Sequence, residues 1–249
     1  MTAVWAHRGC TEGPEGEGGE SPVENTLEAF MEARRVGADG VELDVRLTAD
    51  GALAVHHDAL IPGVGTIASL TVHDLPSHVP LLADVLAVCD GMVVNVEIKN
   101  APQDPGHDPS EAVAALTATA IDEAGWTDRV LVSSFQLSTL RAVQVADARL
   151  PLGALWGFDV RPDAALAEAV ADGFRAIHPF VSFVTPDLVA EAHGAGLAVN
   201  VWTVNSDDDL RAMVALGADT VITDRLRAGL AVAAAGGGGG AVGLGAGDV

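Results

Sequence analysis

Lysine is almost absent from this chain: Lys99 is the single lysine among 249 residues, and the other basic side chains are arginine and histidine. Thirteen Lys and Arg residues stand against 35 Asp and Glu residues, which gives a formal net charge of −22. This charge argues against nucleic acid and anionic membrane surfaces as partners, because both are bound through basic patches. We therefore expect no nucleic-acid partner and no stable membrane association. An anionic substrate would need a local cluster of basic side chains or a bound metal.

Cysteines and long apolar runs are also scarce. Cys10 and Cys89 are the only cysteines, and two cysteines supply no disulfide framework. No apolar run approaches the length of a membrane span. The first residues lack the basic start and apolar stretch of a signal peptide. We expect a cytoplasmic protein, and nothing in the composition indicates its oligomeric state.

Short strand-like runs alternate with helical stretches along most of the chain. This alternation predicts a parallel sheet covered by helices, most simply an α/β fold of the (β/α)8 TIM-barrel type. The strand-like runs are 3–8, 40–47, 52–57, 92–99, 129–134, 151–156, 174–178, 198–204 and 219–223. The helical stretches are 26–36, 81–89, 110–124, 136–146, 163–172, 186–195 and 207–216.

Nine strand-like runs exceed the eight places of such a barrel. Asp50-Gly51 stands between two of them and is a strong hairpin signal. A tight hairpin joins antiparallel neighbours, so 52–57 is predicted to be an extra strand that folds back after strand 2. The result is a single barrel domain over residues 1–231. The acidic, Gly-rich loop 11–22 is expected to be mobile, and the Gly/Ala-rich tail 232–249 is expected to be disordered.

Polar residues lie near the C-terminal ends of the predicted strands, where barrel active sites are built. Because strand side chains alternate between two faces, Glu42 and Asp44 share one face, and so do Glu97 and Lys99. Three carboxylates in one confined site repel each other, and a hard divalent cation such as Mg²⁺ or Ca²⁺ would remove that repulsion. The alternative is a layer of salt bridges without a metal, with Arg8 and Lys99 as the partners.

Two of the eight histidines, His7 and His57, stand at the ends of predicted strands. A hydrolase that breaks a P–O bond needs one group to deprotonate the nucleophile and another to protonate the leaving oxygen. Two imidazoles can fill both roles near neutral pH. A lone histidine on a strand is more often structural than catalytic. His56 competes with His57, since only one of them can point into the site, and we favour His57 because it adjoins Asp58.

Nine short motifs occur in a fixed order along residues 4–230. They are AHRG (6–9), ENTL (24–27), ELDV (42–45), LTADG (47–51), VHHD (55–58), EIK (97–99), SF (134–135), VWTVN (201–205) and ITD (222–224). The first motif alone is weak, but the ordered set is highly specific. It resembles the glycerophosphodiester phosphodiesterase family.

The resemblance implies a TIM barrel that hydrolyses glycerophosphodiesters to sn-glycerol 3-phosphate and an alcohol. In the family a glycerol hydroxyl next to the ester can attack first, and water then opens the cyclic phosphate. Carried over by position, the implied roles are general acid/base for His7 and His57, ligands of one divalent cation for Glu42, Asp44 and Glu97, phosphate contacts for Arg8 and Lys99, and an aromatic wall for Trp202. The implied supporting roles are a place near the metal or its waters for Glu24, holding a loop or capping a helix for Asn25, and support without metal contact for Asp224.

The sequence departs from the family pattern in two places. About ten extra acidic and Gly residues separate AHRG from ENTL, and Val23 intervenes between Pro22 and Glu24. A loop there would lie over the mouth of the site. The subdomain that many members insert after HD is close to minimal here, over residues 58–80, which leaves the substrate range open.

Two other functions are kept as alternatives. One is a phospholipase-D-like enzyme on the same barrel that acts on lysophospholipid or sphingomyelin. Such an enzyme would be expected to be secreted and to carry a lipid-facing apolar surface, and the sequence shows no sign of either. The other is a barrel that binds phosphoesters without cleaving them, which the retention of both histidines and all three carboxylates opposes. Lys99 itself has a structural alternative, an ion pair with Glu97 or Asp44.

Overall fold

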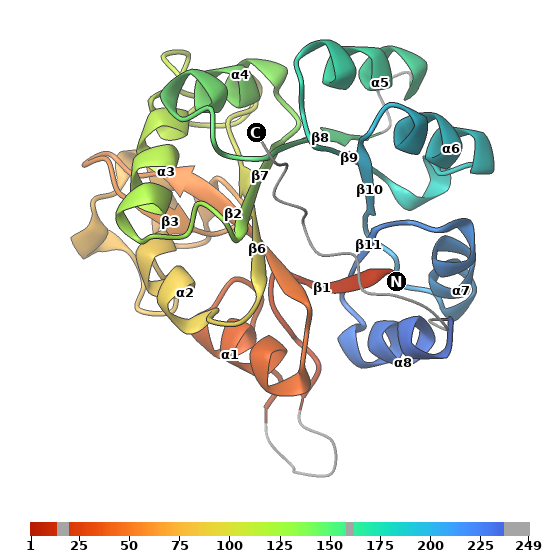
Figure 1. Cartoon of the computed structure of the whole chain (residues 1–249). Coiled ribbons are helices and arrows are strands. Elements are labelled where there is room, and N and C mark those ends of the chain that lie inside the picture. The colour runs from red at the N-terminus through yellow and green to blue at the C-terminus, as the bar shows by residue number, and fades with distance from the viewer. Residues whose placement is uncertain (14–19, 158–161, 237–249) are drawn as a thin grey trace.

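The computed structural model describes residues 1–13, 20–157 and 162–236. Eight parallel strands form its inner ring, and β1 pairs with both β2 and β11, which closes the ring (Figure 1). The strands are β1 (Ala3–His7), β2 (Gly40–Leu47), β6 (Val93–Ile98), β7 (Val130–Ser134), β8 (Leu152–Trp156), β9 (Ala176–Pro179), β10 (Ala198–Val201) and β11 (Thr220–Thr223). The predicted TIM barrel is confirmed.

Helices cover the outside of the ring in the described part of the chain (Figure 1). They are α1 (Leu27–Val36), α2 (Leu82–Val88), α3 (Ala112–Glu123), α4 (Leu137–Ala146), α5 (Pro162–Ala171), α6 (Pro186–Gly194), α7 (Asp207–Leu216) and α8 (Leu226–Gly236). A short 3₁₀ helix, η3 (Val181–Phe183), follows β9. None of these helices is both long enough and apolar enough to cross a membrane.

Helix α8 was not predicted, and it corrects the expected start of the disordered tail. Residues 232–236 are the last residues of this helix, so disorder from residue 232 is wrong. Leu226, Gly229 and Ala233 are buried, and their spacing places them on one helical face against the barrel. The Gly-rich composition that follows hid this helical pattern. Residues 237–249, the rest of the predicted tail, lie outside the described residues.

The extra strand is present where the hairpin signal placed it. β3 (Leu53–Val55) runs antiparallel to β2, with Val45 opposite Val55. β3 ends two residues before His57, so the alternation of strand side chains does not extend to that histidine. The short region after it holds β4 (Leu60–Ile61), β5 (Gly65–Thr66), η1 (Ile67–Ser69) and η2 (Val72–Asp74). Its apolar side chains Ile61, Ile67, Leu70 and Val79 form a small cluster with Ala54 of β3.

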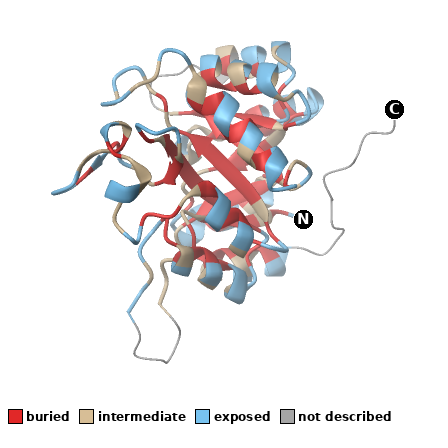
Figure 2. Cartoon of the chain, turned by 90° about the vertical axis from the view of Figure 1, so that its left-hand side faces the viewer, coloured by how far each residue is buried: buried red, intermediate tan, exposed pale blue. Residues whose placement is uncertain are grey.

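The main core lies between the strands and the helices. Along β2, Val41, Leu43 and Val45 are fully buried in that layer, and Figure 2 shows buried strands flanked by helices with exposed outer faces. The residues between them, Glu42 and Asp44, therefore belong to the inner face of the ring. The same pleat that builds the core thus carries carboxylates into the barrel.

The acidic loop is described only at its two ends. Residues 14–19 lie outside the described residues, so its predicted mobility stays a prediction. On the N-terminal side, the Glu12 carboxylate accepts a hydrogen bond from the main-chain N–H of Arg227 at 2.9 Å. The entry to the loop is thereby attached to α8.

Candidate active site

Three carboxylates meet inside the barrel at neighbouring strands. Glu42 and Asp44 come from β2, Glu97 comes from β6, and Asp44 lies opposite Glu97 in the strand register. One oxygen from each carboxylate lies within 4.8 Å of the other two, and all three residues are buried. The group could hold a metal ion.

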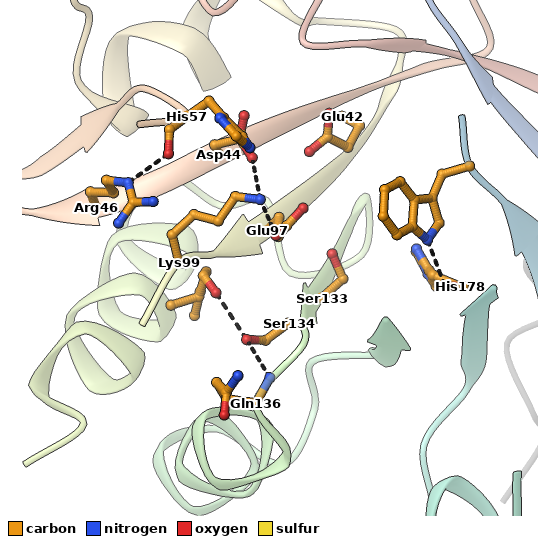
Figure 3. A network of polar contacts seen from close by, with 12 residues as sticks. Glu42, Asp44, Arg46, His57, Glu97, Lys99, Ser133, Ser134, Gln136 and His178 are labelled. Carbon is orange, nitrogen blue, oxygen red and sulfur yellow. Dashed lines mark hydrogen bonds and ion pairs between the residues drawn. The ribbon is translucent and has the colours of Figure 1, made fainter. Parts of the chain in front are cut away.

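Two cations, Lys99 and Arg8, lie against these carboxylates, and Figure 3 shows Lys99 between Asp44 and Glu97. Lys99 Nζ is 3.1 Å from Asp44 Oδ1 and also pairs with Glu97. Arg8 Nε is 3.3 Å from Asp44 Oδ2. If all three carboxyl groups are ionised, three negative charges against two positive charges leave one negative charge over, and Glu42 is the carboxylate with neither cation in its ion pairs.

Glu42 carries the feature that fits a metal. Its Oε2 accepts the main-chain N–H of Arg8 at 3.1 Å, whereas its Oε1 is buried with no hydrogen-bond partner among the described residues. A buried carboxylate oxygen without a partner is costly unless something else binds it. All three candidate ligands supply oxygen, which suits Mg²⁺ or Ca²⁺.

The electrostatics of the three carboxyl groups differ. Burial and the charge of Asp44 raise the pKa of Glu42 to about 8. Burial also raises the pKa of Glu97, against the opposing effect of Lys99. For Asp44 burial acts in the same direction, but Lys99 and Arg8 outweigh it and lower the pKa. A cation would therefore displace a proton from Glu42 rather than from Asp44.

His7 borders the Glu42 side of this cluster. Its Nδ1 is 2.7 Å from Asp224 Oδ1, and its Nε2 is 3.9 Å from Glu42 Oε2. Asn205 Nδ2 donates to the other Asp224 oxygen at 2.6 Å, which holds that carboxylate in place. Burial acts to lower the pKa of His7, but the hydrogen bond to Asp224 and the charge of Glu42 outweigh it and raise the pKa. Asp224 thus lies behind His7 and outside the carboxylate cluster.

His57 borders the Asp44 and Glu97 side. Its Nδ1 is 2.7 Å from Asp58 Oδ1, and its charge opposes the burial that acts to raise the pKa values of Asp44 and Glu97. His56 instead bonds to the main-chain oxygen of Asp58 through its Nδ1 at 2.9 Å. Each of His7 and His57 therefore has a carboxylate at Nδ1 that orients the ring and leaves Nε2 for proton transfer.

The turn after β1 is held in an unusual backbone conformation. Arg8 and Asn25 both have φ of 57°, in the left-handed region that few side chains other than Asn and Asp adopt readily. The main-chain N–H of Asn25 donates to the Arg8 carbonyl at 2.9 Å, and Asn25 Nδ2 donates to Asp44 at 2.8 Å. Asn25 thus holds the loop, while Thr26 provides the N-cap of α1. Glu24 lies on Arg8, 2.9 Å from its Nη1, and not among the three buried carboxylates.

Gly9 is the one position in this turn where a side chain has no room. Its φ is +83°, and a Cβ there would lie 2.7 Å from the Ala29 Cβ of α1. We expect Gly9→Ala to lower the free energy of unfolding by about 1–3 kcal/mol, measured by chemical denaturation. Gly51→Ala is the matched control, since Gly51 has φ of +84° and open space around it. An equal loss in both variants would contradict a role for the Ala29 contact.

An aromatic group lies beside the cluster. Trp202 follows β10, and its ring lies 5.4 Å from that of Phe135 and 5.3 Å from that of Phe180, centroid to centroid. Lys99 Nζ is 5.7 Å from the Phe135 ring centroid, so the aromatic group adjoins the charged one. The Trp202 Nε1–H donates to the His178 carbonyl at 2.8 Å and fixes the indole.

Sequence reasoning left several of these partners without a role. Asp58 and Asn205 lie in the motifs VHHD and VWTVN, in which the predicted roles belong to His57 and Trp202. Phe135 stood in the SF motif, and Phe180 was not singled out. The signal that could have indicated Phe135 and Phe180 is the scarcity of aromatic residues, which make up only 4% of the chain.

A model of the glycerophosphoryl diester phosphodiesterase family matches residues 7–228. The chain belongs to this family. The matched segment begins at His7 and extends past Asp224, so it contains every residue of the site described above.

Relatives named as glycerophosphodiester phosphodiesterases, and solved structures with the same fold, resemble the chain along most of its length. It is 33% identical to a glycerophosphodiester phosphodiesterase of Bacillus altitudinis, covering 90% of this chain and 95% of that one. It is 30% identical to one of Caldanaerobacter subterraneus, covering 90% and 94%. The crystal structure of a glycerophosphodiester phosphodiesterase from Parabacteroides distasonis shares the fold, with a TM-score of 0.80, 24% identity and coverage of 94% and 97%.

Proposed function

We propose that this chain is a phosphoric diester hydrolase that converts glycerophosphodiesters to sn-glycerol 3-phosphate and an alcohol. One divalent cation, Mg²⁺ or Ca²⁺, is held by Glu42, Asp44 and Glu97. The observation that carries the proposal is the buried Glu42 oxygen that has no hydrogen-bond partner in the described part of the chain, in a carboxylate cluster bordered by His7 and His57. Family membership and the names of the relatives support the same substrate class.

The cationic side chains bind the phosphate. When bound, the metal ion supplies positive charge for a phosphate oxygen and lowers the pKa of a hydroxyl group. Lys99 and Arg8 add charge-assisted hydrogen bonds to the other phosphate oxygens as negative charge grows on them. Their side chains are 12% and 18% exposed, so little water competes for these contacts.

The two histidines move the protons. One imidazole takes the proton of the attacking hydroxyl, and the other gives its proton to the oxygen of the leaving alcohol. If the neighbouring glycerol hydroxyl attacks first, a cyclic phosphate forms and the alcohol leaves. Water then opens the cycle to give glycerol phosphate, with the two proton transfers running in the opposite direction. Asp224 and Asp58 keep His7 and His57 oriented through both steps.

The test is release of glycerol 3-phosphate from glycerophosphocholine and glycerophosphoethanolamine. We expect release that EDTA abolishes and that Mg²⁺ or Ca²⁺ restores, because the three ionised carboxylates carry one negative charge more than Lys99 and Arg8 neutralise. Release that is indifferent to EDTA would contradict the metal role. Cleavage of lysophosphatidylcholine or sphingomyelin without cleavage of the deacylated diesters would favour the lipid-acting alternative, and phosphoester binding without turnover would favour the binding barrel.

A further inference from the structure

Arg46 is a buried cation outside the carboxylate cluster, and the proposed reaction does not use it. It lies two residues beyond Asp44, on the same face of β2, with its side chain 11% exposed. Its Nε donates to the main-chain oxygen of His57 at 2.7 Å, and its Nη1 donates to Asp104 Oδ2 at 2.9 Å. Figure 3 shows the Arg46 guanidinium against the main-chain oxygen of His57, with Asp44 and Lys99 nearby.

We infer that Arg46 is a positioning residue that fixes the main chain from which the His57 imidazole projects. The inference rests on the proposed function, in which His57 transfers a proton. Within the described residues, Arg46 links three segments: strand β2, the segment that follows β3, and the loop that contains Asp104.

The His57 segment has few other attachments. β3 ends at Val55, so residues 56–58 have no strand pairing. The main-chain N–H of His56 donates to the Asp44 carbonyl at 2.9 Å, which ties one peptide group to β2. The hydrogen bond from Arg46 Nε ties the His57 carbonyl to the same strand. Asp58 orients the ring through Nδ1, but its own side chain is 72% exposed, so it does not fix the main chain of this segment.

The other end of the Arg46 guanidinium has a firm anchor. Asp104 lies in a loop that Asn100 closes, since Asn100 Oδ1 accepts the Asp108 N–H at 2.8 Å and Asn100 Nδ2 donates to the Asp108 carbonyl at 2.9 Å. Gly106 in this loop approaches Ala68 so closely that a Cβ at Gly106 would lie 2.4 Å from the Ala68 Cβ. These contacts hold the loop in place, so Asp104 restrains the guanidinium.

The surroundings of Arg46 favour positioning over contact with the substrate. A cavity of about 20 Å³ adjoins Arg46 and Lys99, which is room for about one water molecule. Two of the guanidinium nitrogens are already bonded to His57 and Asp104. Arg46 therefore acts through His57.

The experiment is a double-mutant cycle between Arg46→Met and His57→Ala. We expect Arg46→Met to lower kcat by about 10–100-fold with KM little changed, because a small displacement of a proton-transfer group has an effect of that order. In the His57→Ala background the same substitution should change kcat by less than about 2-fold, since no imidazole is left to position. Asp104→Asn and Arg46→Lys should show intermediate losses, because each keeps part of the link.

Arg129→Met is the matched control. Arg129 also pairs with an aspartate, Asp90, at 2.9 Å, but it precedes β7 at the far end of the barrel, and its loss should leave kcat unchanged. Wild-type kcat in folded Arg46→Met would overturn the inference, and so would the same fold loss with and without His57. If Arg46→Met does not fold, Arg46→Lys and Asp104→Asn replace it, and their kcat is compared with wild type and between the backgrounds with and without His57.

A second readout separates this inference from the proposed function. In ¹⁵N-histidine NMR, the His57 imidazole resonances should shift in Arg46→Met and stay in place in Arg129→Met, whether or not the protein cleaves any diester. Unmoved His57 resonances would overturn the positioning role. A wild-type protein that is inactive on all diesters would count against the proposed function alone.

Discussion

His7→Ala and His57→Ala are each expected to lower kcat by about 10²–10⁴-fold, the usual contribution of a general acid or base. Each imidazole has a carboxylate at Nδ1, Asp224 or Asp58, and each borders a different side of the carboxylate cluster. Neither ring can therefore replace the other. The measurement is kcat for glycerophosphocholine with saturating metal, together with the thermal unfolding midpoint of each variant.

Controls for folding separate a loss of catalysis from a loss of structure. The His7 side chain is 16% exposed and that of His57 is 36% exposed, so neither substitution empties the apolar core. His193→Ala is the matched control, because His193 also pairs with an aspartate, Asp219 at 2.8 Å, on the outside of the barrel. We expect that variant to keep wild-type kcat. Near-normal kcat in either site variant would remove that histidine from the mechanism.

The strand positions in the site could be predicted from sequence because they depend on local rules. The period of two along β2 separates Val41, Leu43 and Val45 from Glu42 and Asp44, and the structure has that separation. The Asp50-Gly51 signal placed β3 beside β2 in the same way. Both features depend on residues that are close together in the sequence, so they can be predicted without knowledge of the tertiary structure.

The contacts that the sequence did not predict join segments far apart along the chain. Arg46 meets Asp104 across 58 positions, and His7 meets Asp224 across 217. The position of His57 is likewise not a consequence of strand alternation, since β3 ends before it. Helix α8 was missed for a different reason: its buried face uses Gly229 and Ala233, small residues whose burial depends on packing against the barrel. These features depend on the closed barrel, which brings distant strand ends together.

Glu42→Gln is expected to abolish most of the metal-dependent activity and to remove a proton release that accompanies metal binding. In the metal-free protein the pKa of Glu42 is about 8, so below that pH the carboxyl group holds a proton that the cation must displace. The metal affinity should therefore rise with pH up to about pH 8, by at most about tenfold per pH unit. Calorimetric titration with Mg²⁺ and Ca²⁺ in buffers of different ionisation enthalpy measures both the affinity and the number of protons released.

The stability of the metal-free protein gives the same pKa an independent test. The folded pKa of Glu42, about 8, lies above its ordinary value of 4.5, so between these pH values the unfolded state binds fewer protons than the folded state. The stability contributed by the neutral carboxyl group is fully present below about pH 4.5 and is lost as the pH rises through 8. Saturating metal should offset that loss, and Glu42→Gln should lack it, whereas Glu28→Gln at the exposed start of α1 should behave as wild type. A metal affinity independent of pH between about 6 and 8, with no proton released, would mean that Glu42 is already ionised and that the unpaired oxygen is not where the cation binds.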